Sequence, residues 1–99
     1  MYFDRQGNPI SFERWAELMS MDEYRRVAWD EPQVGVYIST VWLGLNHGCS
    51  LDEPLIFETM VFNSPSDQDC RRYTSEVEAH VGHLSAVERV SAGRDPWGN

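Results

Sequence analysis

The sequence has no lysine, only two cysteines and none of the usual signatures of enzyme families. Two cysteines are too few for the disulfide framework of a small secreted domain, so Cys49 and Cys70 are expected as reduced thiols of a cytoplasmic protein. The motifs GxxxxGK[ST], GxGxxG, CxxC and HExxH are absent, which removes the common phosphate, dinucleotide and zinc-hydrolase patterns. No stretch approaches the ~20 apolar residues of a membrane span, and the first residues contain no apolar secretory segment.

The chain is strongly acidic, with 16 Asp and Glu against eight arginines and a net charge of −8. This balance argues against direct binding to nucleic acid and against an anionic membrane surface, because both require a basic footprint. It suits a partner protein with a basic surface, although net negative charge also serves solubility alone. An inhibitor that imitates nucleic acid would need the carboxylates on one face, and in the sequence they are spread evenly.

The 99 residues have room for one domain, predicted over 1–93, with 94–99 as a mobile tail. Residues 34–43 and 55–62 are rich in β-branched and aromatic side chains, which predicts two neighbouring strands. Both faces of the first strand are largely apolar. It is therefore expected at the centre of a sheet, covered on both faces or covered on one and exposed for binding.

Two helices are predicted around these strands. The first covers residues 12–20 and follows Ser11, which supplies an N-cap oxygen. The second covers residues 75–91, where Ser75 and Glu78 form a capping box. Four aliphatic residues lie along one stripe of the second helix, which indicates its packed side: Val77, Val81, Leu84 and Val87.

Weaker strand patterns occur near residues 25–29 and 70–73, and Asp30-Glu31-Pro32 is expected to end the first of them. Together these elements predict an α+β fold, with an antiparallel sheet of three to four strands and two helices packed mainly on one face. The opposite face would remain partly uncovered. With its surplus of aromatic residues, it is the expected docking place for a partner or for a second copy of the chain.

The second helix also carries weak candidates for metal binding. Glu76, His80 and His83 follow one another at i, i+4 and i+7, so their side chains share a face, and all three are zinc-compatible ligands. The span is roughly 10 Å along the axis, too long for three ligands on one ion. A complete site would need a further ligand from the sheet side: His47, Cys49 or Glu58. A half-buried structural histidine at His80 is the simpler interpretation, and no cofactor or metal is predicted.

Two other residues have competing interpretations. Cys49 lies two positions from His47, and an adjacent imidazole can activate a thiol for hydrolysis, but neighbours this close seldom reach catalytic geometry. Glu58 lies inside an apolar strand. A carboxylate there requires either an arginine partner, Arg71 or Arg72, or a sheet face open to solvent.

Four segments carry a resemblance that spans most of the chain. They are Asn8-Pro9-Ile10-Ser11 with Trp15-Ala16, then Ser39 to His47, Leu55 to Phe62, and Arg72-Tyr73-Thr74-Ser75 leading to Ala79 and Gly82-His83. The chain resembles a family of small proteins encoded by bacteriophages and prophages, especially those of actinobacteria. Family members usually carry Asp where Asn46 stands here. The resemblance implies a phage genome as the source and implies no particular reaction.

The sequence favours a small non-enzymatic phage accessory or host-takeover protein that binds a host protein, in the host cytoplasm, through an aromatic patch with an acidic surround. One alternative is a metal-dependent or hydrolytic enzyme that uses His47, Glu58, His80 and His83. Another is a structural homodimer that pairs exposed sheet faces. The candidate binding residues are Tyr37, Trp42, His47, Glu58, Tyr73 and His83.

Overall fold

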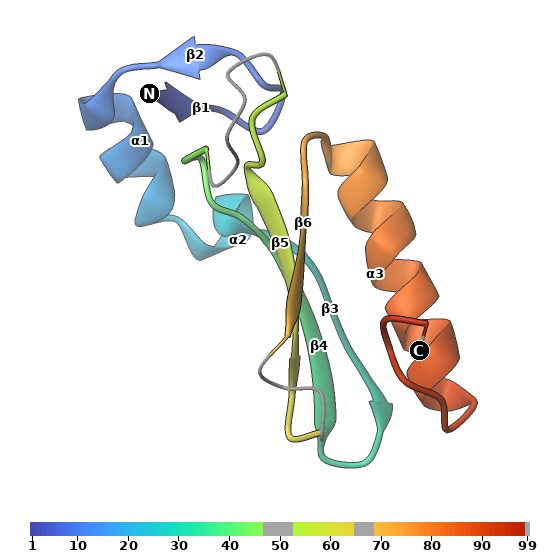
Figure 1. Ribbon diagram of the computed structural model, residues 1–99. Coiled ribbons are helices and arrows are strands. Elements are labelled where there is room, and N and C mark those ends of the chain that lie inside the picture. The colour runs from blue at the N-terminus through green and yellow to red at the C-terminus, as the bar shows by residue number, and fades with distance from the viewer. Residues whose placement is uncertain (47–52, 65–68, 99) are drawn as a thin grey trace.

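The computed structural model describes residues 1–46, 53–64 and 69–98. In chain order its elements are β1 (Tyr2–Phe3), β2 (Pro9–Ile10), α1 (Phe12–Met19), α2 (Asp22–Arg25), β3 (Arg26–Gln33), β4 (Val36–Trp42), β5 (Phe57–Phe62), β6 (Cys70–Tyr73) and α3 (Glu76–Ser91) (Figure 1). The predicted α+β class is confirmed. A four-stranded antiparallel sheet has the order β3-β4-β5-β6, and β1 pairs with β2 in a separate two-stranded sheet. Among the described ranges, none of the helices combines the length and the apolar composition needed to traverse a bilayer.

The two predicted strands are confirmed as neighbours at the centre of the sheet. β4 and β5 pair in a register that places Ile38 opposite Val61 and Thr40 opposite Thr59. Since side chains alternate along a strand, these four residues point to one face, and all four are completely buried. We refer to this side as the inner face and to the opposite side as the open face.

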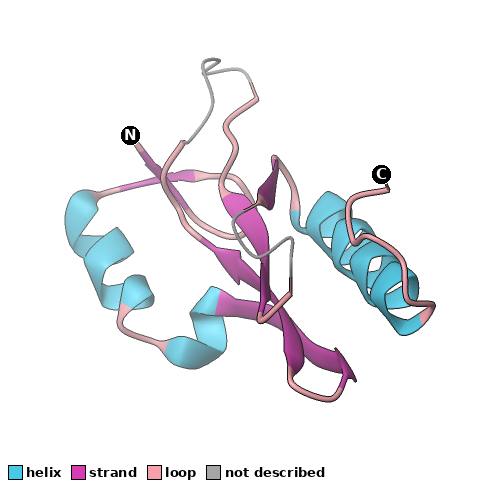
Figure 2. Ribbon diagram, turned by 60° about the horizontal axis from the view of Figure 1, so that its bottom comes forward, coloured by secondary structure: helices cyan, strands magenta, loops and turns pink. Residues whose placement is uncertain are grey.

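Helix α3 covers the inner face and contacts all four strands (Figure 2). Ser75 is confirmed as its N-cap, because the Ser75 hydroxyl accepts a hydrogen bond from the backbone N–H of Glu78, and the Glu78 carboxylate in turn accepts from the hydroxyls of Thr74 and Ser75. The residues of α3 that are buried against the sheet are Ala79, His83, Ala86 and Val90. Small side chains let the helix approach closely. At Gly82 a Cβ atom would lie only 2.2 Å from the hydroxyl oxygen of Tyr73, so glycine is required for this contact.

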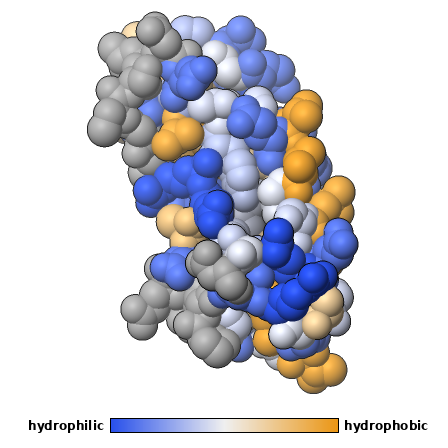
Figure 3. Space-filling view, turned by 45° about the vertical axis from the view of Figure 1, so that its right-hand side comes forward, coloured by the Kyte–Doolittle hydropathy of each residue, from blue (hydrophilic) through white to orange (hydrophobic). Residues whose placement is uncertain are grey.

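The prediction that the stripe of aliphatic residues forms the packed side of α3 is wrong for three of its four members. Val77, Val81 and Leu84 point to solvent, with 63–74% of their surface exposed, and Val87 alone packs against the core. Figure 3 looks at the α3 side of the molecule and shows hydrophobic surface there. Helix α3 is therefore apolar on both sides.

The N-terminal elements gather at one end of the sheet (Figure 1). Ser11 caps α1 as predicted, since its hydroxyl accepts from the backbone N–H of Arg14 at 3.1 Å. Leu18 of α1 joins Phe3 and Trp42 in one buried cluster, and the Trp42 indole donates to the carbonyl of Phe3 at 3.0 Å. These contacts anchor the N-terminal segment to the last residue of β4.

Strand β3 differs from its prediction. It does not end at Asp30-Glu31-Pro32 but continues to Gln33, with irregular register between Asp30 and Gln33. The physical reason is its position at the edge of the sheet, where proline removes a hydrogen-bond donor that no neighbouring strand requires.

The last described residues also differ from the predicted mobile tail. Pro96 is buried, and Trp97 packs against the cluster that contains Ile38 and Val61. Arg71 of β6 donates to the carbonyl oxygen of Trp97 at 3.0 Å, and its guanidinium carbon lies 5.4 Å from the centre of the Trp97 ring. Residues 94–98 therefore form part of the folded domain.

Candidate functional site

An exposed aromatic surface on the open face comprises Trp29 of β3, Tyr37 of β4 and Phe62 of β5. We refer to these three residues as the aromatic patch. The rings of Trp29 and Tyr37 stack with their centroids 5.3 Å apart, and the register places Tyr37 opposite Phe62. Trp29 is 47% exposed and Phe62 is 40% exposed. In the lower half of Figure 1, no helix of the described chain covers this side of the sheet.

Charged side chains border the aromatic patch. The guanidinium carbon of Arg26 lies 5.8 Å from the centre of the Trp29 ring, within the range of a cation–π contact. A pocket of about 450 Å³ opens beside Trp29, and Asp22 and Glu23 of α2 contribute to its lining. Two carboxylates and the Arg26 guanidinium therefore adjoin the exposed indole.

The other end of the open face holds the predicted carboxylate. Glu58 accepts a hydrogen bond from Nε of Arg72 at 3.0 Å, which confirms one of its two predicted arginine partners. Cys70 of β6 lies near this pair. Burial raises the pKa of the Cys70 thiol, and the neighbouring Glu58 carboxylate raises it further. The thiol is therefore protonated and a poor nucleophile at neutral pH.

A chain of polar groups crosses the inner face beneath α3. His83, 1% exposed, lies between Thr40 and Asp30, with each ring nitrogen 2.7 Å from its partner oxygen. The hydroxyl of Thr40 lies 2.5 Å from that of Thr59. Because a carboxylate only accepts, Nε2 donates to Asp30; in the tautomer that carries its proton on Nε2, Nδ1 accepts from Thr40, and Thr40 accepts from Thr59.

These polar groups follow one another in the order hydroxyl, imidazole and carboxylate, as in the catalytic triads of hydrolases. The end that is exposed to solvent is, however, the opposite one. Thr40, at the position of a nucleophile, is completely buried, whereas Asp30 at the other end is half-exposed. A nucleophile must contact its substrate, so these groups stabilise the fold and do not form a hydrolytic centre. The prediction of His83 as a binding residue is accordingly wrong, since α3 and the sheet enclose it.

The remaining predicted binding residues are distributed over the molecule. Tyr37 and Glu58 lie on the open face, as a docking surface requires. Trp42 is completely buried and presents no free surface for binding, whereas Tyr73 is half-buried and packs over Gly82. His47, together with Cys49, lies outside the described residues.

Sequence reasoning missed Trp29 and Phe62 as members of the patch. Trp29 is recognisable as the second residue of an alternating pair in the predicted strand near 25–29. Phe62 is the last residue of β5, and alternation from Phe57 places it on the open face. Cross-strand register, which the sequence does not give, brings both beside Tyr37.

The weak metal candidates on α3 do not converge. Oε1 of Glu76 accepts from Nε of Arg5 at 2.7 Å, and Oε2 lies 3.7 Å from His80. Both nitrogens of His83 are occupied by Thr40 and Asp30. The hydrogen bond from Arg5 lowers the pKa of Glu76. Within residues 1–46, 53–64 and 69–98, no group of three His, Cys, Asp or Glu side chains is placed to hold a metal ion.

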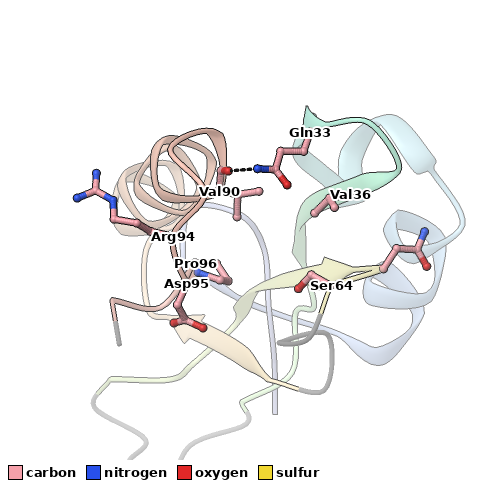
Figure 4. Close-up of a pocket in the computed structure, with 9 residues that line it drawn as sticks. Gln33, Val36, Ser64, Val90, Arg94, Asp95 and Pro96 are labelled. Carbon is pink, nitrogen blue, oxygen red and sulfur yellow. Dashed lines mark hydrogen bonds between the residues drawn. The ribbon is translucent and has the colours of Figure 1, made fainter.

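Another pocket, of about 420 Å³, lies between the end of α3, the β3–β4 turn and the end of β5 (Figure 4). Gln33 closes one side by donating to the carbonyl of Val90 at 2.8 Å. Arg94 points away from the space between Val36 and Pro96 in this view. The described lining also includes Asp95, beside the apolar side chains of Val36, Val90 and Pro96.

Comparison of the chain with protein-family models, with curated proteins and with solved structures finds no match. The resemblance to phage-encoded proteins stays a prediction.

Proposed function

We propose that this chain is a small non-enzymatic phage protein that binds a host protein through the aromatic patch. The observation that carries the proposal is the half-exposed Trp29 of the edge strand β3, stacked on Tyr37 of β4 on a sheet face that no described helix covers. Trp, Tyr and Arg are the residues most enriched in the energetic centres of protein interfaces, and the patch combines the first two with Arg26.

The energy available at the patch is substantial. Burying the exposed part of Trp29 removes on the order of 100 Å² of apolar surface from water, which contributes about 2–3 kcal/mol. The stacked Tyr37 and the strand backbone hold the ring in place before binding, so little side-chain entropy is lost on association. Phe62 adds a second apolar contact on the neighbouring strand.

The surroundings of the patch favour a basic partner. Asp22 and Glu23 line the pocket beside Trp29, and the chain carries a net charge of −8. Complementary charge accelerates association and suppresses binding to acidic competitors. A host protein with a basic surface around an apolar recess has the required chemistry.

The enzymatic alternative receives no comparable support from the described residues. Glu58 lies on the open face, His83 is enclosed on the inner face, and His80 lies on the exposed flank of α3. Three groups on three surfaces cannot act on one substrate.

Affinity purification from phage-infected cells tests the proposal. The bait is the wild-type chain beside Trp29→Ser, Phe62→Ser and the matched control Leu84→Ser, which removes exposed apolar surface from α3 instead. Wild type and control should capture the same host protein, and the two patch variants should lose it by tenfold or more. Equal capture by all four baits would contradict the proposal.

The homodimer alternative predicts a different result. If two copies pair through the patch, sedimentation of the wild type at micromolar concentration gives a dimer, Trp29→Ser gives a monomer, and the infected cells yield no specific partner. A monomeric wild type with a captured host protein supports the proposed function.

A further inference from the structure

Half of the arginines lack a carboxylate partner in the described part of the chain. Four arginines form ion pairs: Arg5 with Glu76, Arg14 with Glu17, Arg25 with Asp22, and Arg72 with Glu58. Arg26 stacks on Trp29. Arg71, Arg89 and Arg94 contact none of the described Asp or Glu side chains. In a protein with a net charge of −8, arginines that lie close together without a carboxylate partner are unexpected.

Two of these unpaired arginines line the same pocket. Arg71 and Arg89 border a space of about 300 Å³ together with the paired Arg72. The other lining residues come from β6, α3 and the C-terminal segment: Tyr73, Gly82, Ser85, Pro96 and Trp97. We refer to this space as the arginine pocket. It contains no described carboxylate in its lining.

The fold holds the Arg71 guanidinium in place before any ligand binds, and the Arg89 guanidinium lies beside the C-terminal segment. Arg71 is held by its hydrogen bond to the carbonyl of Trp97 and by the Trp97 ring, which leaves its other N–H groups free to donate. Arg89 rises from α3, and its guanidinium lies against Gly98. Among the described residues, the side chain of Arg89 makes no hydrogen bond and no ion pair, whereas its backbone carbonyl accepts from Ala92 and Arg94.

We infer that the arginine pocket binds a small molecule that carries a phosphate group. Arginine presents planar, paired N–H donors that match the oxygens of phosphate, and two unpaired guanidinium groups balance its two negative charges. The hydroxyl of Ser85 lines the same space and supplies a neutral donor. The volume lies at the lower end of small-molecule sites, enough for a phosphate with a small organic group.

The arginine pocket is independent of the aromatic patch. Tyr73 and Arg71 lie on the α3 side of β6, opposite Phe57 and Thr59 of the inner face, whereas the patch lies on the open face. A ligand in the pocket would contact both Arg71 and Arg89, which themselves contact Trp97 and Gly98. Its expected effect on the protein is to hold residues 97–98 against β6 and α3.

Titration of the ¹⁵N-labelled protein with inorganic phosphate, and separately with adenosine monophosphate, tests the inference. Saturable amide shifts are expected for residues 71–73, 85 and 89, at equal ionic strength. Tighter binding of adenosine monophosphate than of inorganic phosphate would identify a phosphorylated small molecule as the ligand class, and the reverse order would identify the free anion. A parallel titration with acetate should give at least tenfold weaker binding, since a monoanionic carboxylate engages one guanidinium.

Arg89→Gln is the decisive variant, because the Arg89 side chain has no hydrogen-bond or ion-pair partner among the described residues to lose. It should weaken phosphate binding by about tenfold or more, the loss expected for one charge-assisted hydrogen-bonding group. Arg14→Gln on α1 changes the net charge equally, far from the pocket, and should alter binding less than twofold. Shifts that do not saturate, or an equal loss in both variants, would overturn the inference. Neither result bears on capture of the host protein by the aromatic patch.

Discussion

Replacement of His83 by leucine should destabilise the protein by removing the acceptor at the centre of a buried polar chain. In the wild type the imidazole accepts from Thr40 and donates to Asp30, each at 2.7 Å. Leucine is of similar volume, so no large cavity forms. The cost arises because the buried Thr40 hydroxyl loses its acceptor, whereas the half-exposed Asp30 regains water.

An unsatisfied buried hydroxyl costs about 1–3 kcal/mol, and this range is the expected loss in the free energy of unfolding for His83→Leu. For a domain of this size, 1 kcal/mol lowers the melting temperature by roughly 4–8 °C. The pair of substitutions Thr40→Val and Thr59→Val should cost a similar amount, because it removes the donor to Nδ1 of the buried imidazole.

The triple variant combines His83→Leu, Thr40→Val and Thr59→Val, so that all three side chains are apolar. It tests whether these residues form a coupled network or make independent contacts. Because no buried polar group is then left without a partner, its stability should equal or exceed that of His83→Leu. Urea unfolding, followed by tryptophan fluorescence, measures all variants. If the losses of the single and double variants add in the triple variant to within about 0.5 kcal/mol, the reasoning is refuted.

Three further predictions follow from contacts around α3 and β6. Gly82→Ala should lower the free energy of unfolding by about 1–2 kcal/mol, measured by urea unfolding. The new methyl group displaces the Tyr73 ring, and the cost of this displacement exceeds the gain in helix propensity. An unchanged midpoint would contradict the close contact. The hydrogen bond from Arg5 lowers the pKa of Glu76 below 4.5, so the pair stabilises the fold fully above that pH and less as pH falls through the lowered pKa. Glu76→Gln should therefore flatten the loss of stability below pH 4.5, measured by thermal melts across pH, and an unaltered acid profile would refute the assignment. The raised pKa of Cys70 predicts alkylation at pH 8 slower than that of a free peptide thiol, measured by mass spectrometry of the peptide that contains it; an equal rate would contradict it.

The central strands were predictable because their sequence pattern and their environment agree. Residues 34–43 and 55–62 are dense in β-branched and aromatic residues, and such segments fold as strands wherever they are buried. The capping residues Ser11 and Ser75 were also predictable, since the hydrogen bond that each makes is local in the chain.

The packed side of α3 could not be inferred from the sequence, because the most hydrophobic side of the helix is not the side that packs against the sheet. Val77, Val81 and Leu84 give the stronger apolar signal, yet the sheet selects small residues and His83, whose burial depends on Thr40 and Asp30 from distant strands. The aromatic patch was hidden for the same reason: it exists only when the register of three strands is known. Long-range pairing decides both features.

The outward-facing valines and leucine of α3 bear on how the protein behaves as a colloid. The side chains of Val77, Val81 and Leu84 are exposed and do not contribute to the packed core. In a concentrated solution, repulsion between the negatively charged molecules prevents these side chains from associating. Near pH 4.6, where the titratable groups in the sequence sum to about zero net charge, that repulsion vanishes. Turbidity should therefore peak near this pH, and glutamate in place of Val81 should restore a clear solution without any loss of folded structure.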